Sequence, residues 1–297
     1  MPTTFPDSTR VALSHNARKQ RAVRGVLNGA VGVVAALALI PFVYLLVRAS
    51  QKPVNEIAQL LIRPKTIEVL ATTSALVLCV VITTVVMGVL MASGLHFVRL
   101  PFRGLLLIPT VLPLAIPSYV FTYTWVALIP EFSGFFAAAF ILSITTLPYV
   151  ILATLSGLRT VDSSQIEVAR SLGLTLPQTF RRVVFPQVKG HISAGALLAA
   201  LYTISDFGAV SLLNVETLTV TIQNMYRASY DRSAAAVISF VLIAFSTIVV
   251  VADERIKRQT PDSKVVKVYS TKRTLIDSLW LRVAVIATVA LYALNAV

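Results

Sequence analysis

Charged side chains are scarce in this sequence. Only 13% of the 297 residues are Asp, Glu, Lys or Arg, while 56% are hydrophobic. A soluble domain of this size carries about a quarter charged residues, so this chain has too little polar surface to cover a water-soluble globule. The composition therefore predicts a protein whose outer solvent is membrane lipid.

Cysteine and histidine are also nearly absent. The single cysteine, Cys79, lies in an apolar run, and His15, His96 and His191 are scattered along the chain. One thiol cannot form an internal disulfide, and no Cys/His cluster has metal-ligand spacing. We therefore expect no metal site, no thiol catalysis and no cofactor bound by this chain.

The positive charge is distributed in a way that argues against nucleic-acid binding. The net charge is +13, yet Lys and Arg form short clusters between long uncharged runs, as they do beside anionic lipid. With loops assigned to alternating sides, nineteen Lys and Arg fall on one side and six on the other, and Arg282 completes the 26. The positive-inside rule then predicts a multi-pass protein of the bacterial inner membrane with a cytoplasmic N-terminus.

Six stretches with hardly any charge are long enough to cross the hydrocarbon core, which takes about 20 helical residues. These predicted spans are Val26–Val47, Val69–Leu95, Gly104–Ile129, Phe132–Leu158, Ser193–Leu213 and Ser233–Ala252. Backbone groups in lipid must be hydrogen-bonded within the chain, so we predict an all-α polytopic helix bundle.

A seventh apolar run begins near Leu279 and contains Arg282. We expect it to open a further part of a longer protein; the alternative is a marginal final helix. The predicted organisation is a basic tail (1–25), a six-helix domain (26–252) with a cytoplasmic loop (159–191), a basic linker (253–278) and the start of a further hydrophobic segment (279–297).

The loop between the fourth and fifth predicted spans carries the clearest local signals. Ser164 and Glu167 form a capping-box pattern, and Gly173 suits the left-handed position that ends a short helix. Thr175 can cap a second short helix, which Pro186 should close. The apolar stripe of the first helix consists of Ile166, Ala169 and Leu172.

This loop resembles the loop motif of the permeases of binding-protein-dependent ABC importers. The family motif has Glu-Ala-Ala, a Gly four residues after the last Ala, and further on an apolar pair followed by Pro. The matching residues here are Glu167, Val168, Ala169, Gly173, Phe180 and Val184-Phe185-Pro186. Val168 and Phe185 stand where Ala and Leu are usual, and both remain apolar.

The resemblance implies a type I importer permease without a catalytic site of its own. In that family the loop is a coupling helix seated in a groove of the ATPase subunit, with the Glu and Gly holding its shape. The implied partners are an ABC ATPase dimer that uses the ATP, a periplasmic substrate-binding protein, and a second permease half, fused or separate. The alternative for the loop is an amphipathic linker helix that rests on membrane lipid.

Three further segments resemble the iron(III)-type branch of these permeases. They are residues 114–120, 206–210 and 230–232. That branch usually fuses two six-helix halves in one chain, and it implies ferric iron as the cargo. Related permeases carry phosphonate, polyamine, thiamine or sulfate on similar frames, so these cargoes stay open.

Asp206 is the acidic residue that lies well inside a predicted span. A charge near the bilayer centre costs at least about 2.5–3.5 kcal/mol on insertion scales. Asp206 is therefore either a polar group that lines the translocation pathway, or a cap or helix–helix hydrogen bond beside Gly208.

The third predicted span contains prolines at every fourth position, Pro109, Pro113 and Pro117. Each removes a backbone donor and frees a carbonyl one turn earlier, so we expect the prolines to line one side of a bent helix beside the pathway. The alternative is a kinked helix with a structural role alone. Tyr119 is a further pathway candidate because of its hydroxyl group.

Two other classes of protein are less consistent with these residues. A secondary transporter would use Asp206 as a proton or ion site, and it leaves the loop motif unexplained. A membrane-embedded enzyme needs convergent acid, base or metal groups, and one aspartate without an intramembrane His or Glu partner is too few.

Overall fold

The computed structural model describes residues 7–227, 231–258 and 276–296, and most of these residues are helical. Among them, the β-type pairing is an isolated parallel bridge between Val98 and Ile276. The prediction of an all-α fold is confirmed.

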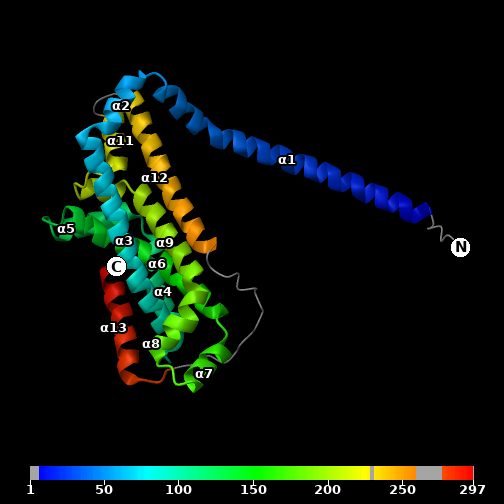
Figure 1. The fold of residues 1–297 in the computed structure, drawn as a ribbon, viewed down its shortest axis with the longest axis vertical. Helices are drawn as coiled ribbons and strands as arrows, with labels where there is room; N and C mark the ends of the chain where they lie inside the picture. Colours follow the sequence, from blue (N-terminus) through cyan, green and yellow to red (C-terminus); the bar gives the residue numbers. More distant parts are fainter. Residues whose placement is uncertain (1–6, 228–230, 259–275, 297) are drawn as a thin grey trace.

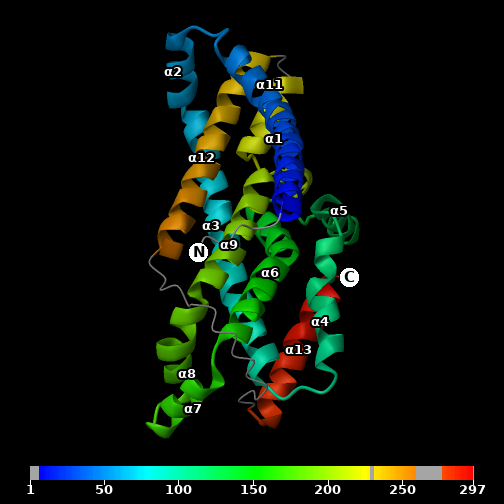
Figure 2. The same cartoon turned by 90° about the vertical axis from the view of Figure 1, so that its right-hand side faces the viewer.

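Four upright helices form the body of the molecule (Figures 1 and 2). They are α3 (Pro64–Phe97), α6 (Phe135–Thr160), α9 (Phe185–Ser205) and α12 (Arg232–Arg258). Ile141, Leu142 and Ile151 of α6 are fully buried, so this helix lies in the core. A Cβ atom on Gly195 of α9 would lie 2.8 Å from the Cα atom of Val150 in α6. Small residues thus let the backbones of α6 and α9 approach closely.

Helix α1 (Asp7–Ala49) is 43 residues long and projects away from the bundle, as Figure 1 shows. The predicted first span lies inside it. Its C-terminal part packs against α12, where the rings of Phe42 and Phe240 meet edge to face with centroids 5.6 Å apart. Val31 and Val34 in its apolar stretch are 64% and 66% exposed. This surface therefore needs lipid or another protein segment to cover it.

The third predicted span is not one helix. It consists of α4 (Arg103–Val111), a 3₁₀ turn, η1 (Leu112–Ala115), and α5 (Ser118–Leu128), and α5 is bent by 93° from the preceding pair. Pro113 lies in the 3₁₀ turn and Pro117 immediately precedes α5. The bend that the prolines predict is confirmed, but the expectation that they line one side of a single helix is wrong, because two missing backbone donors within five residues interrupt the helix.

The fifth predicted span, Ser193–Leu213, is also interrupted. Helix α9 ends at Ser205, Asp206 has an extended backbone, and a short helix, α10 (Gly208–Leu212), follows. By length and composition, four described helices can cross a membrane, or five if the bent α4–α5 pair is counted as one span. The multi-span bundle is confirmed, and the prediction of six continuous spans is wrong for the third and fifth.

The two ends of the bundle carry different short elements. Helices α2 (Val54–Ile62) and α11 (Leu218–Arg227) lie at one end. At the opposite end, Figure 1 shows α7 (Ser163–Ser171) and α8 (Leu176–Thr179). A π-helical segment, η2 (Phe180–Val184), joins α8 to α9.

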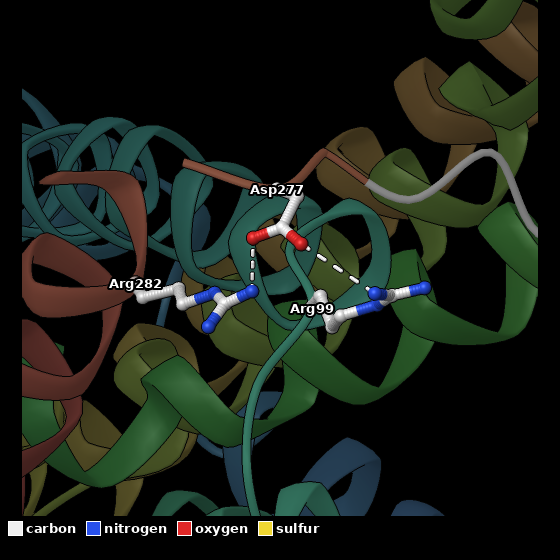
Figure 3. A network of polar contacts seen from close by, with 3 residues as sticks. All are labelled: Arg99, Asp277 and Arg282. Carbon is white, nitrogen blue, oxygen red and sulfur yellow. Dashed lines mark hydrogen bonds and ion pairs between the residues drawn. The ribbon is translucent and has the colours of Figure 1, made fainter. Parts of the chain in front are cut away.

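The seventh apolar run forms α13 (Leu279–Ala296), which packs against α4, α3 and α6. The buried hydroxyl group of Tyr292 donates a hydrogen bond to the Ile144 carbonyl at 3.0 Å. Figure 3 shows the start of α13, where Asp277 pairs with Arg282 and with Arg99, whose Nη1 atom is 3.4 Å from Oδ2. These contacts dock α13 on the bundle. Most of the predicted linker 253–278, and Tyr230 in the 230–232 segment, lie outside the described residues.

Candidate functional site

The predicted cytoplasmic loop begins with a capped helix. The carboxylate of Asp162 accepts hydrogen bonds from the Ser164 backbone N–H at 2.9 Å and from the Ser164 hydroxyl group at 2.7 Å. These bonds hold the pKa of Asp162 below its ordinary value. The expectation that Ser164 caps the helix is wrong, since the helix starts at Ser163 and Asp162 is the N-cap. Aspartate is a strong N-cap residue, so the sequence contained this signal.

Helix α7 separates a buried side from an exposed side. Ile166 and Ala169 are buried as predicted, whereas Leu172 is 78% exposed. The predicted stripe is therefore wrong at Leu172, because the chain leaves the helix there to make its turn. Glu167 is exposed, and Val168 is 59% exposed. The outer face thus presents a carboxylate together with two large apolar side chains.

Gly173 makes the turn between the two short helices. Its φ angle of +86° lies in the left-handed region, where glycine carries no steric cost, and the predicted helix end is confirmed. The Leu174 N–H donates to the Ala169 carbonyl at 3.2 Å, and the Arg170 guanidinium donates to the Leu174 carbonyl at 3.0 Å. One backbone angle and two hydrogen bonds between residues close in the sequence therefore set the shape of this two-helix elbow.

The second helix starts where the sequence predicts it. The side-chain oxygen of Gln178 accepts a hydrogen bond from the Thr175 backbone N–H at 2.9 Å. Pro186, however, does not close the run, because η2 and α9 continue the helix through it. The Phe185 N–H donates to the Phe180 carbonyl five residues back. This wider turn accommodates a proline that lacks a donor and would crowd a regular turn.

One side-chain bridge ties α7 to the start of α9. The Gln187 amide donates to the Gln165 side-chain oxygen at 3.0 Å and to the Val183 carbonyl at 2.7 Å. Phe180 packs against the main hydrophobic core. Residues 162–187 thus form one compact element at the end of the bundle, which we call the coupling element after the role that the sequence resemblance implies. The glutamine bridge was not anticipated, because its partners are 22 residues apart in the sequence.

Asp206 lies at the interruption between α9 and α10, where it is 8% exposed. Its Oδ1 atom accepts the backbone N–H groups of Ala209 at 2.9 Å and Val210 at 3.3 Å. Its Oδ2 atom accepts the Ser118 hydroxyl group at 2.5 Å. The Thr219 hydroxyl group donates to the Asp206 carbonyl at 2.7 Å. The Asp206 carboxylate therefore caps one helix and bonds another, and Ser118 is a partner that the sequence reasoning missed.

Helix α5 places two tyrosines beside this interruption. Tyr119 is 52% exposed and Tyr123 is 61% exposed. A Cβ atom on Gly208 would lie 2.9 Å from the Tyr119 Cβ atom, so α5 and α10 are in close contact. Pro113 is buried, and Pro117 directly precedes Ser118. The four residues proposed for the pathway, Asp206, Tyr119, Pro113 and Pro117, thus lie on the two interrupted segments, and their role in transport stays a prediction.

Neither region contains the groups of a metal centre. Within the described residues, no cluster of three or more His, Cys, Asp or Glu side chains is arranged to hold a metal ion. The two candidate regions are therefore an exposed elbow at one end of the bundle, and two interrupted helices that expose aromatic side chains.

The described residues thus form a multi-pass helix bundle with an exposed two-helix elbow at one end. The chain belongs to the family of binding-protein-dependent transport system inner membrane components, which matches residues 84–260. The match contains α6, the coupling element, α9 and α12.

Two curated relatives illustrate the range of the similarity. The chain is 34% identical to the Fe(3+)-transport system permease protein FbpB 2 of Haemophilus influenzae, over 71% of this chain and 42% of that protein. It is 28% identical to the sulfate transport system permease protein CysT of Salmonella typhimurium, over 72% of this chain and 84% of the relative. The alignment thus covers less than half of the iron-transport relative.

Two solved structures share the fold. A bacterial ABC transporter involved in the import of the acidic polysaccharide alginate matches with a TM-score of 0.64 at 13% identity, over 84% of this chain and 99% of its own. An amino acid ABC transporter, crystallised with histidines, matches with a TM-score of 0.50 at 21% identity, over 65% and 92% of the two chains. At these identities the likeness concerns the fold alone.

Proposed function

We propose that this chain is the membrane-spanning subunit of an ATP-driven importer and that residues Glu167–Pro186 couple it to a separate ABC ATPase. ATP is used in the ATPase dimer, and this chain supplies a moving bundle instead of a catalytic centre. A periplasmic binding protein delivers the cargo to the opposite end, and a second permease half, fused or separate, completes the pathway.

One observation carries this proposal. The coupling element exposes Glu167, Val168 and Leu172 on a single compact elbow. An exposed carboxylate next to exposed apolar side chains suits a protein groove better than water alone. Glu167 follows the buried Ile166, so its backbone is fixed while its side chain remains free to meet a partner.

The charge distribution supports a cytoplasmic position for the elbow and for the N-terminus. Residues 159–191 contain five Lys or Arg and two acidic residues. Short loops of this kind stay on the cytoplasmic side of the bacterial membrane. The end of the bundle with α2 and α11 then faces the periplasm and the binding protein.

Ferric iron is the cargo we propose, and its support is the 34% identity to the iron-transport permease. Sulfate is the second candidate, because sulfate permeases match over a larger share of their own length. Uptake of radiolabelled ferric iron and of radiolabelled sulfate, each measured with a binding protein for that ion, separates the two. Competition by the unlabelled ion gives the result directly.

The test of coupling is Glu167→Ala in the natural permease, expressed with its ATPase. We expect normal membrane insertion, loss of ATPase co-purification, and uptake lowered by at least about tenfold, because about 1.4 kcal/mol of lost contact energy gives that factor. Gly173→Pro should have the same effect, because proline cannot adopt φ near +86°.

Glu131→Ala is the matched control, since it removes an exposed carboxylate from the loop before α6 at the other end of that helix. The control should leave ATPase binding unchanged. Uptake that persists at the natural level in Glu167→Ala and Gly173→Pro would contradict the coupling role. Uptake that persists without any ATPase would instead favour a gradient-driven carrier.

A further inference from the structure

The two broken helices meet at one carboxylate. The α4–α5 bend and the α9–α10 interruption are far apart in the sequence, yet Ser118 at the start of α5 bonds Asp206 before α10. The carbonyl of the same aspartate accepts the Thr219 hydroxyl group of α11. Asp206 therefore touches α5, α10 and α11 from the end of α9.

An interrupted helix in a membrane needs hydrogen-bond partners for its free backbone groups. Backbone groups freed by an interrupted helix must be satisfied by protein or by a water-filled cavity. Here the first free N–H groups of α10, on Ala209 and Val210, bond the Asp206 carboxylate. Its other oxygen is taken by the hydroxyl group of Ser118, which is 7% exposed. Both carboxylate oxygens are thus engaged by the chain itself. We call this contact of Asp206 with Ser118, Ala209 and Val210 the joint.

The contact between α5 and α10 also holds a group of exposed aromatic side chains in place. Gly208 lies against Tyr119, with no room for a Cβ atom between them. Tyr119, Tyr123 and Phe207 are 52%, 61% and 42% exposed beside the buried joint. The joint thus fixes the position of an exposed aromatic surface on the two broken segments.

The joint lies on the side of the bundle away from the coupling element. The Gly134 N–H, at the start of α6, donates to the Leu213 carbonyl just after α10 at 2.7 Å. The opposite end of α6, at Thr160, leads into the coupling element. A helix of 21 residues such as α9 spans about 31 Å, which separates the two regions along the bundle axis.

We propose that Asp206 is a positioning residue that locks α5 onto α10, and that it is not an ion or substrate ligand. The joint requires an acceptor at the Oδ1 position for the two N–H groups and a hydrogen-bonding group at the Oδ2 position for the Ser118 hydroxyl group, and it does not require the negative charge. An asparagine side chain can reproduce it, because its carbonyl oxygen can accept the two N–H groups and its NH₂ group can donate to the Ser118 hydroxyl group. An alanine leaves three buried donors without an acceptor.

The test compares Asp206→Asn with Asp206→Ala in two measurements. The first is the labelling rate of a single cysteine placed at Tyr123, in a Cys79→Ser background, by a membrane-impermeant maleimide without cargo or ATP. We expect the Asp206→Asn rate to match that of the parent, and the Asp206→Ala rate to differ by about fivefold or more, because α5 loses a buried hydrogen-bonded anchor.

The second measurement is uptake, which rests on the importer function proposed above. Asp206→Asn should keep uptake within about threefold of the parent, and Asp206→Ala should lower it by about tenfold. Gly208→Ala breaks the same joint from the α10 side without touching the carboxylate, so it should reproduce Asp206→Ala in both measurements. If Asp206→Ala fails to accumulate, Gly208→Ala and Asp206→Asn still decide the outcome.

One result would overturn the inference. It is an Asp206→Asn protein that labels at the parental rate and transports as little as Asp206→Ala, because the negative charge itself would then be required. Failure of the importer function gives a different result. Uptake would then be independent of the ATPase in every variant, while the labelling rates would still test whether Asp206 holds α5 on α10.

Discussion

Glu167 and Asp206 are both acidic residues at the ends of the same pair of packed helices, and the structure places them in opposite environments. Glu167 is exposed on the coupling element beside Val168, which is 59% exposed. Asp206 is 8% exposed and accepts three hydrogen bonds on its carboxylate. The first can offer its charge to a partner, whereas both oxygens of the second already accept hydrogen bonds from the chain.

The bonds that hold the two regions differ in range as well. The elbow is shaped by neighbours in the sequence, such as Arg170 with Leu174 and Thr175 with Gln178. The joint depends on Ser118 and Asp206, which are 88 positions apart. Substitutions in the elbow should therefore change partner binding and leave the bundle folded. Substitutions near the joint or between the helices should change the bundle itself.

The largest effect on stability is expected at the α6–α9 contact that connects the two regions. In Gly195→Ala the new Cβ atom would lie 2.8 Å from the Val150 Cα atom and 3.0 Å from the Tyr149 carbonyl oxygen. Backbone atoms cannot move aside cheaply, so overpacking should cost about 1–3 kcal/mol. Thermal melting in mild detergent measures this loss.

Gly104→Ala is the matched control for that substitution. Gly104 lies in α4 with nothing within 4 Å of its Cβ position. Alanine in an open helical site should stabilise by about 0.5–1 kcal/mol, the opposite sign. A Gly195→Ala protein that melts at or above the natural temperature would show that α6 and α9 are not closely packed.

A smaller effect, confined to partner binding, is expected for Gly173→Ala. Both Gly173 and Gly134 have φ of +86° and open space around the Cβ position. Alanine in the left-handed region costs about 1–2 kcal/mol at position 173. At Gly134, where ψ is −174°, the backbone lies in a region that is essentially restricted to glycine, so alanine is strained there as well. Only position 173 lies on the coupling element, so Gly173→Ala should reduce ATPase co-purification by about tenfold. Gly134→Ala should leave it unchanged; equal losses at both sites would mean that the strain acts through the fold.

The smallest effect concerns the end of the bundle opposite the elbow, at acidic pH. The Ala234 N–H donates to Asp231 and the Lys52 ammonium group lies 3.0 Å from it, so the pKa of Asp231 is lowered, chiefly by the backbone bond. A lowered folded-state pKa means that the stabilisation is complete above the unfolded pKa of about 4. It is lost as the pH falls through the folded value.

Melting curves between neutral pH and about pH 3 check this prediction. The natural protein should lose stability in the acid range. Asp231→Asn should be less stable at neutral pH and should show a shallower acid decline. An unchanged slope in Asp231→Asn would assign the acid sensitivity to other carboxylates.

Local signals in the sequence were sufficient for much of the coupling element. Gly173 and Thr175 behave as predicted, because a left-handed turn and a helix start depend on a few adjacent residues. The sequence predicts Ser164 as the N-cap, whereas the structure has Asp162. Two good N-cap residues stand two positions apart, and only the backbone conformation shows which of them caps the helix. Pro186 was expected to end a helix, and the wide turn that admits it depends on packing.

The breaks in the bundle were harder to predict. The composition of residues 104–129 indicates that they are apolar enough to cross a membrane, but it does not indicate whether they form one straight helix. The prolines predict a bend, but neither its 93° angle nor the contact of Gly208 in α10 with Tyr119 in α5 follows from them. The partner of Asp206 is set by tertiary folding, so the sequence alone does not indicate that Ser118, 88 positions away, bonds its carboxylate.

The π-helical turn at Phe180–Val184 gives the long helix behind the elbow a property that a regular helix lacks. Such a turn holds one residue more than an α-turn, and each helical residue advances by about 100°. Conversion of this turn to regular α-geometry would therefore swing the faces of α9 by about a quarter of a revolution relative to α8.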